Sequence, residues 1–111
     1  MTVGFAVVRA EHLHLFTLVG GLVAAGAQPV VYVRSGDLIR GYEGWQPTSQ
    51  ARHPAELLAD DAVDLVVTVG VPADRATVAI AALEAGKAVL SAKPGVTTRA
   101  DLDRIRTLVA D

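Results

Sequence analysis

The sequence predicts an α/β domain of the doubly wound, Rossmann-like type, with one parallel sheet and helices on both faces. Two observations predict this class. Short runs of Val, Leu, Ile and Ala alternate with segments of helical periodicity along the chain. Hydrophobic residues make up 51% of the chain but aromatic residues only 5%, and small aliphatic side chains suit strands covered on both faces. The 111 residues accommodate a single domain, residues 1–111.

The predicted elements follow from the apolar pattern. Strands are expected at 3–8, 30–33, 65–69 and 88–91, and helices at 12–25, 55–59, 72–85 and about 98–109. Gly26 and Gly86 are expected to end two of the helices, and Pro54 and Pro72 to begin two others. Thr98 caps the last helix, where Leu102, Ile105, Leu108 and Val109 line one side and Asp101 completes a capping box. Segment 34–53 is polar and is predicted to be mostly loop, with room for one helical turn.

Composition excludes several classes of function. The net charge of -2 and the lack of a basic run argue against nucleic acid as a partner. The chain contains no cysteine, which excludes disulfides, thiolate catalysis and cysteine-bound zinc. His12 and His14 would point to different sides of a helix, so no metal site is expected. No targeting or membrane-spanning segment is evident, and a cytoplasmic protein with no membrane partner is expected.

In a parallel α/β sheet, ligands bind beyond the carboxyl ends of the strands, where the strand order reverses. The turns at 9–12, 34–37, 70–73 and 92–95 follow the four predicted strands. These turns are therefore the candidate site.

The second half of the chain carries a specific combination of motifs. Val71-Pro72 is followed by the run Ala81-Ala82-Leu83-Glu84-Ala85-Gly86-Lys87, a short strand, and Lys93-Pro94. In order and spacing, residues 55–111 resemble the N-terminal half of the GFO/IDH/MocA oxidoreductases, which include NAD(P)-dependent sugar and inositol dehydrogenases. Residues 3–26 resemble the first strand and helix of that family more loosely. The resemblance implies a Rossmann domain that binds a nicotinamide dinucleotide.

The resemblance also implies which residues bind the cofactor: Arg9, His12, Arg34, Ser35, Gly70, Val71, Pro72, Lys93 and Pro94. The turn after the first strand lacks glycine, and Arg9 and Leu13 stand where glycines are expected. Arg9 could contact a phosphate by charge, whereas Glu11 would repel it. Arg34 follows the second strand in place of an acid, which favours NADP over NAD. The alternatives are NAD, or no cofactor if the altered turn has lost the site.

Lys93 is the implied catalytic residue, placed near the nicotinamide and the substrate oxygen as a hydrogen-bond or proton donor. Ala92 replaces the acidic residue that precedes this lysine in the family. Gly70 is expected to let the backbone pass close to the cofactor. Relatives often carry a histidine shortly after the proline that begins this helix. This chain has Asp74 and Arg75 there instead, and both are assigned a helix-capping role.

Family members take much of their substrate site from a second domain, and this chain ends after the helix that follows Lys93-Pro94. We therefore expect a sheet without its last strand, no C-terminal domain, and an open sheet edge that pairs with a second copy or a partner chain. Three functions stay open. The chain is the NAD(P)-binding half of an oxidoreductase, a degenerate non-catalytic Rossmann domain with a structural or regulatory role, or a small-ligand-binding module without redox activity. The sequence does not identify a substrate.

Overall fold

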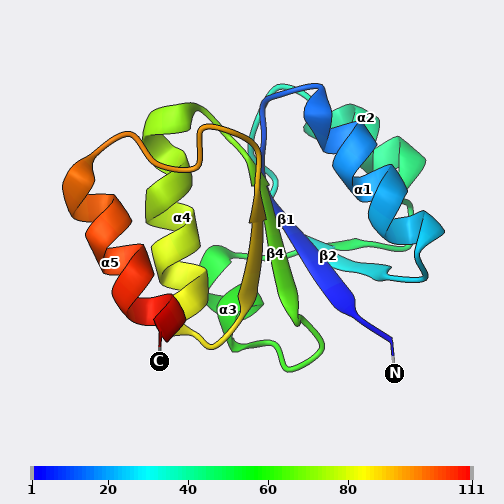
Figure 1. Ribbon diagram of the computed structural model, residues 1–111. Helices are drawn as coiled ribbons and strands as arrows, with labels where there is room; N and C mark the ends of the chain where they lie inside the picture. Colours follow the sequence, from blue (N-terminus) through cyan, green and yellow to red (C-terminus); the bar gives the residue numbers. More distant parts are fainter. Residues whose placement is uncertain (1, 111) are drawn as a thin grey trace.

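Five parallel strands form the central sheet in the order β3-β2-β1-β4-β5 (Figure 1). The structure is a computed structural model that describes residues 2–110. The strands are β1 (Gly4–Ala10), β2 (Gln28–Tyr32), β3 (Gln50–Ala51), β4 (Leu65–Val69) and β5 (Ala88–Ser91). The order runs outward from β1 toward β2 on one side and toward β4 on the other, so the switch point lies between β1 and β4.

Helices cover both faces of the sheet, which confirms the predicted fold class (Figure 1). They are α1 (His14–Ala24), α2 (Ile39–Trp45), α3 (Pro54–Ala59), α4 (Pro72–Glu84) and α5 (Arg99–Ala110). Helices α1 and α2 lie on one face, α3 and α4 lie on the other, and α5 packs beside α4. Each face has its own apolar core. Phe5, Val7 and Val67 belong to the core under α1 and α2, and Ala6 and Val66 to the core under α3 and α4.

The predicted strands at 65–69 and 88–91 agree with β4 and β5 to the residue, but segment 34–53 was predicted wrongly. It contains the two-turn helix α2 and the short strand β3, which pairs with β2 through Val31↔Gln50 and Tyr32↔Ala51. Neither element carries a strong local signal, because α2 contains Gly41 and Gly44 and β3 has only two residues. Burial of Ile39 and Tyr42 against the sheet stabilises α2.

The helix predicted at 12–25 begins two residues later, as α1, because Leu13 precedes it and is 69% exposed, and Leu15 and Val19 are its buried residues. The predicted packing face of the last helix needs one correction. In α5, Leu102, Ile105 and Leu108 are half-buried, but Val109 is 67% exposed. The predicted start of α5 is confirmed, because the Asp101 N–H donates to Thr98 Oγ1 at 3.1 Å.

β5 is the last strand on its side of the sheet, as the sequence led us to expect. Pairing of this edge with a second chain stays a prediction.

Four of the five aromatic residues form one cluster between α1, α2 and β2. Phe16 and Trp45 have ring centroids 5.6 Å apart, Tyr42 and Trp45 6.4 Å, and Tyr32 and Tyr42 5.7 Å. The Tyr42 hydroxyl is fully buried and has no hydrogen-bond partner among residues 2–110. Burial raises the pKa of Tyr42 to about 12.

The raised pKa of Tyr42 predicts a loss of stability at alkaline pH. A tyrosine whose pKa is higher in the folded state contributes stability below its unfolded pKa of about 10, and that stability is lost as the pH rises toward about 12. At pH 11 the loss attributable to Tyr42 is about 1.4 kcal/mol. Urea unfolding at pH 8 and pH 11 measures it, and Tyr42→Phe is expected to remove this part of the pH dependence. Equal losses in both proteins would contradict the assignment.

Candidate functional site

The last residues of β1 include a backbone conformation that is typical of glycine, at a position that is not glycine. Arg9 has a φ of 68°, in the left-handed region that non-glycine residues rarely adopt. The pairing of β1 with β4 shifts at this point, between Val8 and Ala10. The strain of such a residue is on the order of 1 kcal/mol. The sequence prediction that Arg9 stands at a glycine position therefore has a structural counterpart in the backbone.

Neighbouring strands hold this turn in place. The Ala10 N–H donates to Ser35 O at 3.0 Å, and the Glu11 N–H donates to Val69 O at 3.3 Å. Gly36, with a φ of 101°, lies directly against the backbone of Ala10, where an added Cβ would be 2.5 Å from the carbonyl atoms. Only glycine fits there. The amide groups of Ala10 and Glu11 are thus already paired and are not available to a phosphate.

The start of α1 offers two further amide groups. The His14 N–H donates to His12 Nδ1 at 3.1 Å, and the N–H groups of Leu15 and Phe16 donate to the carbonyls of His12 and Leu13. The N–H groups of His12 and Leu13 have no hydrogen-bond partner in the described part of the chain. They are therefore the groups of this turn that an anion can reach.

The histidine prediction was wrong in one respect. The rings of His12 and His14 lie against each other, with centroids 4.3 Å apart. The helical spacing argument does not apply, because His12 precedes α1 rather than belonging to it. Within residues 2–110, no group of three or more possible metal ligands is present. In the same range, no helix is long and apolar enough to cross a membrane.

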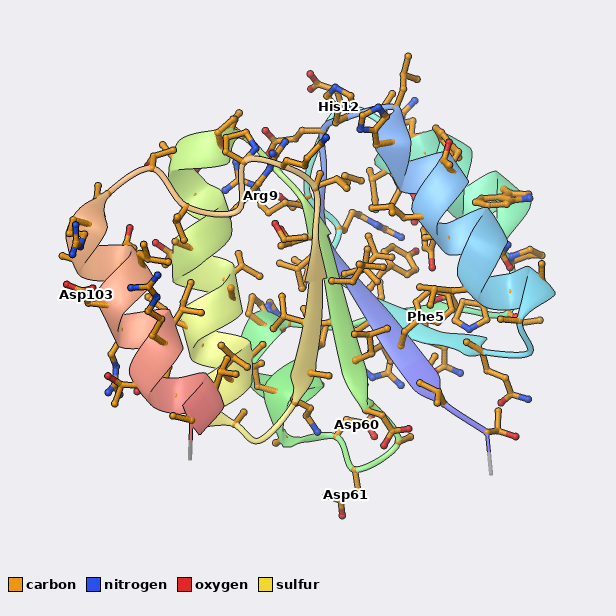
Figure 2. All side chains as sticks on the ribbon, in the orientation of Figure 1. Phe5, Arg9, His12, Asp60, Asp61 and Asp103 are labelled. Atoms are coloured by element: carbon orange, nitrogen blue, oxygen red, sulfur yellow. The ribbon has the colours of Figure 1, made fainter. Side chains whose placement is uncertain are left out.

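Arg9 extends from the β1 turn toward the start of α4, at the upper edge of the sheet in Figure 2. Its Nη2 lies 2.5 Å from Glu11 Oε1 and 3.3 Å from Asp74 Oδ2. The Glu11 carboxylate, expected to repel a phosphate, is therefore balanced by Arg9. The Arg9 side chain also covers Gly70, where an added Cβ would be 2.8 Å from Arg9 Cβ. Gly70 is thus required by Arg9 itself. Asp74 does not cap α4 with its side chain, which corrects its assigned role.

At the end of β2, Arg34 has an acidic partner that sequence reasoning missed. Arg34 Nη2 donates to Glu43 Oε2 at 2.8 Å, and the Tyr32 hydroxyl donates to the same oxygen. The hydrogen bond from Tyr32, with the nearby Arg34, holds the pKa of Glu43 below its usual range. Burial raises the pKa of Tyr32. Glu43 belongs to α2, so no signal placed it here while 34–53 was predicted as loop.

An apolar crevice of about 310 Å³ opens beside these turns, on the face covered by α3 and α4. Its lining residues are Val8, Arg9, Val33, Ser35, Pro54, Leu57, Leu58, Val66, Thr77, Val78 and Ala81. The crevice reaches the carboxyl ends of β1 and β2, because Arg9 and Ser35 form part of its wall. Aliphatic walls with a few polar groups at the mouth suit a flat aromatic ring with a polar substituent.

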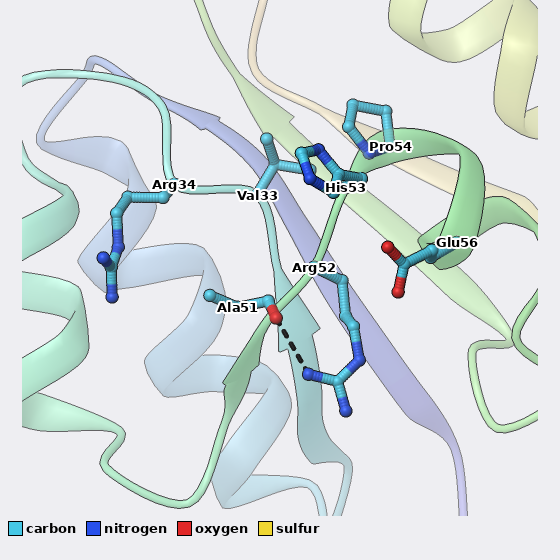
Figure 3. Close-up of a pocket in the computed structure, with 7 residues that line it drawn as sticks. All are labelled: Val33, Arg34, Ala51, Arg52, His53, Pro54 and Glu56. Atoms are coloured by element: carbon cyan, nitrogen blue, oxygen red, sulfur yellow. Dashed lines mark hydrogen bonds between the residues drawn. The ribbon is translucent and has the colours of Figure 1, made fainter.

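A more polar pocket of about 430 Å³ lies next to it, near the carboxyl end of β3 (Figure 3). It is lined by Val33, Arg34, Ala51, Arg52, His53, Pro54 and Glu56. In Figure 3, Arg34 lies apart from Arg52 and Glu56, on the other side of Val33 and Ala51. Arg52 donates to Ala51 O at 2.8 Å and also hydrogen-bonds Gln50. The two arginines therefore do not converge on one anion.

The turns after β4 and β5 are joined by one side chain. Arg75 is 3% exposed, and its guanidinium donates to Gly70 O at 2.7 Å and to the carbonyls of Ala92 and Pro94 at 3.2 Å. The predicted capping role of Arg75 was therefore wrong. Lys93 is exposed and makes no hydrogen bond to a described residue, so its ammonium group is free to meet a ligand. Val71 and Pro72 begin α4, with Val71 44% exposed.

Comparison with known proteins extends these observations. The sequence model of the GFO_IDH_MocA family, described as an oxidoreductase family with an NAD-binding Rossmann fold, matches residues 34–111. Inositol 2-dehydrogenase 1 of Saccharopolyspora erythraea is 38% identical over 107 residues, which are 93% of this chain and 30% of that protein. The matched range excludes the β1 turn, where the sequence departs most from the glycine pattern.

Solved structures with the same fold are similar over nearly all of the chain. A proposed oxidoreductase from Erwinia carotovora atroseptica has a TM-score of 0.88 and 31% identity, over 97% of this chain and 33% of the other. Biliverdin reductase from Synechocystis, solved with biliverdin and NADP+, has a TM-score of 0.80 and 20% identity, over 97% and 34%.

The chain thus spans about a third of the length of these relatives. The family match extends over more than half of the chain, and the strand order and switch point agree with it. This chain belongs to the GFO/IDH/MocA family of oxidoreductases and has its NAD-binding Rossmann fold.

Proposed function

We propose that this chain is the cofactor-binding part of an NAD(P)-dependent dehydrogenase and that it prefers NADP. The observation that carries the proposal is the apolar crevice beside the carboxyl ends of β1 and β2, which Arg9 and Ser35 help to line. In a doubly wound sheet this is the place for the adenosine half of a dinucleotide. The aliphatic side chains of Val33, Leu57 and Val78 would contact the faces of the adenine ring.

Arg34 and Ser35 are the residues proposed to face the adenosine ribose. The side chain of Arg34 is 68% exposed and uses Nη2 for its ion pair with Glu43. Its other N–H groups could bind a 2′-phosphate, and phosphate is a strong acceptor for an arginine fork. Glu43 works against this preference, because its carboxylate competes for Arg34 and repels a phosphate. Cofactor choice then depends on the balance between these two side chains.

The pyrophosphate position is the least regular part of the site. Glycine-rich turns present several backbone amides to a pyrophosphate, whereas here only the N–H groups of His12 and Leu13 are available. We propose that Arg9 replaces the missing amides by charge. Arg9 lines the crevice, and its guanidinium would have to bind the phosphates in competition with Glu11 and Asp74.

The turns after β4 and β5 are proposed to face the nicotinamide. A bound nicotinamide dinucleotide supplies hydride transfer to or from a carbon of the substrate. Lys93 would hydrogen-bond the oxygen on that carbon and would hold or release its proton. The exposed Nζ of Lys93, without a partner among the described residues, suits this role. The substrate would be a compound with a hydroxyl or carbonyl group, as in the inositol dehydrogenase relative.

One observation favours a second candidate function, a Rossmann domain that no longer binds a dinucleotide. The Arg9 side chain covers Gly70 and forms ion pairs with Glu11 and Asp74. If these pairs persist, Arg9 blocks the path of the pyrophosphate, and the chain has a structural or regulatory role. The third function is a module without redox activity that binds only a small ligand, in the apolar crevice.

Calorimetric titration with NADPH, NADH, NADP and NAD tests the cofactor proposal. We expect the phosphorylated forms to bind more tightly. Arg34→Ala should weaken NADPH about tenfold or more, since a charge-assisted phosphate contact contributes about 1.5–3 kcal/mol. The affinity of Arg34→Ala for NADH should change little. Glu43→Gln should strengthen NADPH binding because it frees Arg34.

Arg106, an exposed arginine of α5, offers the control, and Arg106→Ala should leave all four affinities unchanged. Equal affinity for NADH and NADPH, with no effect of Arg34→Ala, would refute the NADP preference. No binding at millimolar concentration of any of the four would instead support the non-binding alternative.

Arg9→Gly separates the two roles proposed for Arg9. If Arg9 binds the pyrophosphate, the variant should bind NADPH about tenfold more weakly, and the affinity should depend less on salt concentration. If Arg9 blocks the site, the variant should bind more tightly. Glycine adopts the φ of 68° at low cost, so the variant should fold, and thermal unfolding verifies this. The direction of the affinity change decides between the functions.

A further inference from the structure

Arg75 is the most deeply buried charged side chain whose role the family resemblance does not supply. It is 3% exposed, on the buried side of α4, and it makes three hydrogen bonds. All three acceptors are backbone carbonyl oxygens. Gly70 O lies in the turn after β4, and Ala92 O and Pro94 O lie in the turn after β5.

Arg75 is a buried cation without an acidic partner. Within residues 2–110 Arg75 forms no salt bridge, so carbonyl dipoles alone compensate its charge. A buried cation without a carboxylate partner is costly. Its place near the N-terminus of α4 adds to that cost, because the helix dipole there favours negative charge. The acceptors of its three hydrogen bonds therefore indicate the role of Arg75.

The hydrogen bonds hold the backbone on both sides of Lys93. Ala92 precedes Lys93 and Pro94 follows it, and the carbonyls of both accept from Nη1 of the same guanidinium. Nε of that planar group is fixed to Gly70 O at 2.7 Å. The rigid fork of Arg75 therefore sets the position of the Lys93 backbone relative to the β4 turn. The side chain of Lys93 remains exposed.

We infer that Arg75 is a positioning residue for Lys93, and that it couples the two turns that meet the nicotinamide half of the cofactor. Ala92 stands where the family has an acidic residue, so the fixed backbone takes over the orientation of the lysine. This inference rests on the proposed function. It predicts that loss of Arg75 harms recognition of the nicotinamide half of the dinucleotide and spares the adenosine half, because the crevice lining does not include Arg75.

The test compares two ligands on the same variants. Adenosine 2′,5′-bisphosphate carries the adenosine half of NADPH and has no nicotinamide. Arg75→Met is expected to lower the affinity for NADPH about fivefold or more and to change the affinity for the bisphosphate by no more than about twofold. Arg75→Lys keeps the charge but not the planar fork, and its affinity for NADPH should lie between those of Arg75→Met and the unaltered chain. Arg104→Met provides the control, because Arg104 is exposed and its guanidinium pairs with Glu84, its one hydrogen-bond partner within residues 2–110.

Amide hydrogen exchange gives a readout that is independent of binding. In Arg75→Met, exchange should rise at Ala92, whose N–H donates to Thr68 O at 3.3 Å, and remain unchanged in β1 and β2. Equal weakening of both ligands, or no weakening of either, would overturn the positioning role. If Arg75→Met does not fold, Arg75→Lys decides by the same comparison. If the unaltered chain binds neither ligand, the proposed function fails, and unchanged exchange at Ala92 would refute the coupling as well.

Discussion

The left-handed turn at Arg9 is the constraint on which the rest of the site depends. Arg9 lies one residue before the end of β1. The N–H groups of the next two residues, Ala10 and Glu11, donate to Ser35 O, after β2, and to Val69 O in β4. Gly36 can approach the backbone of Ala10 only because it has no side chain. The result is a turn with the geometry of a glycine turn and with most of its amides already paired. Whatever binds at this edge must meet a guanidinium rather than a ring of free amides.

Along the carboxyl edge of the sheet, charged side chains therefore stand where a glycine-rich turn would present free backbone N–H groups. Arg9 is paired with Glu11 and Asp74, and Arg34 is paired with Glu43. These pairs are partly exposed, so each contributes little to folding, and an anionic ligand can compete for the arginines. Arg75 differs because it is buried and bound to carbonyls. In the proposed site, Arg9 and Arg34 would bind the anionic ligand, and Arg75 would position the backbone around Lys93.

The sequence predicted the parts of the fold that local patterns encode. β4 and β5 are continuous apolar runs and were located to the residue, and α4 was bounded by Pro72 and Gly86. α2 and β3 escaped prediction because tertiary contacts stabilise them. Tyr42 is buried against Tyr32 and Trp45, and β3 exists only through its pairing with β2. A polar, glycine-containing segment gives no such signal by itself.

For the candidate site, strand order predicts the turns at the carboxyl edge of the sheet, where the structure has them. The family resemblance selected Arg9, Arg34, Gly70 and Lys93 within these turns, and their binding roles stay predictions. Neither source predicts the partners of these residues. Glu43 reaches Arg34 from a helix that was not predicted, and Arg75 binds carbonyls 17 and 19 positions along the chain. Long-range pairs of this kind have no periodicity or local composition from which to infer them.

We propose that the carboxyl edge of the sheet, despite its altered first turn, still holds a dinucleotide. Amide chemical shifts of the 15N-labelled chain during titration with NADPH test this most directly. Saturable changes are expected at residues around the crevice and the turns, above all Arg9, His12, Ser35, Gly70 and Thr77. The absence of changes there, or changes confined to the opposite ends of the strands, would contradict it.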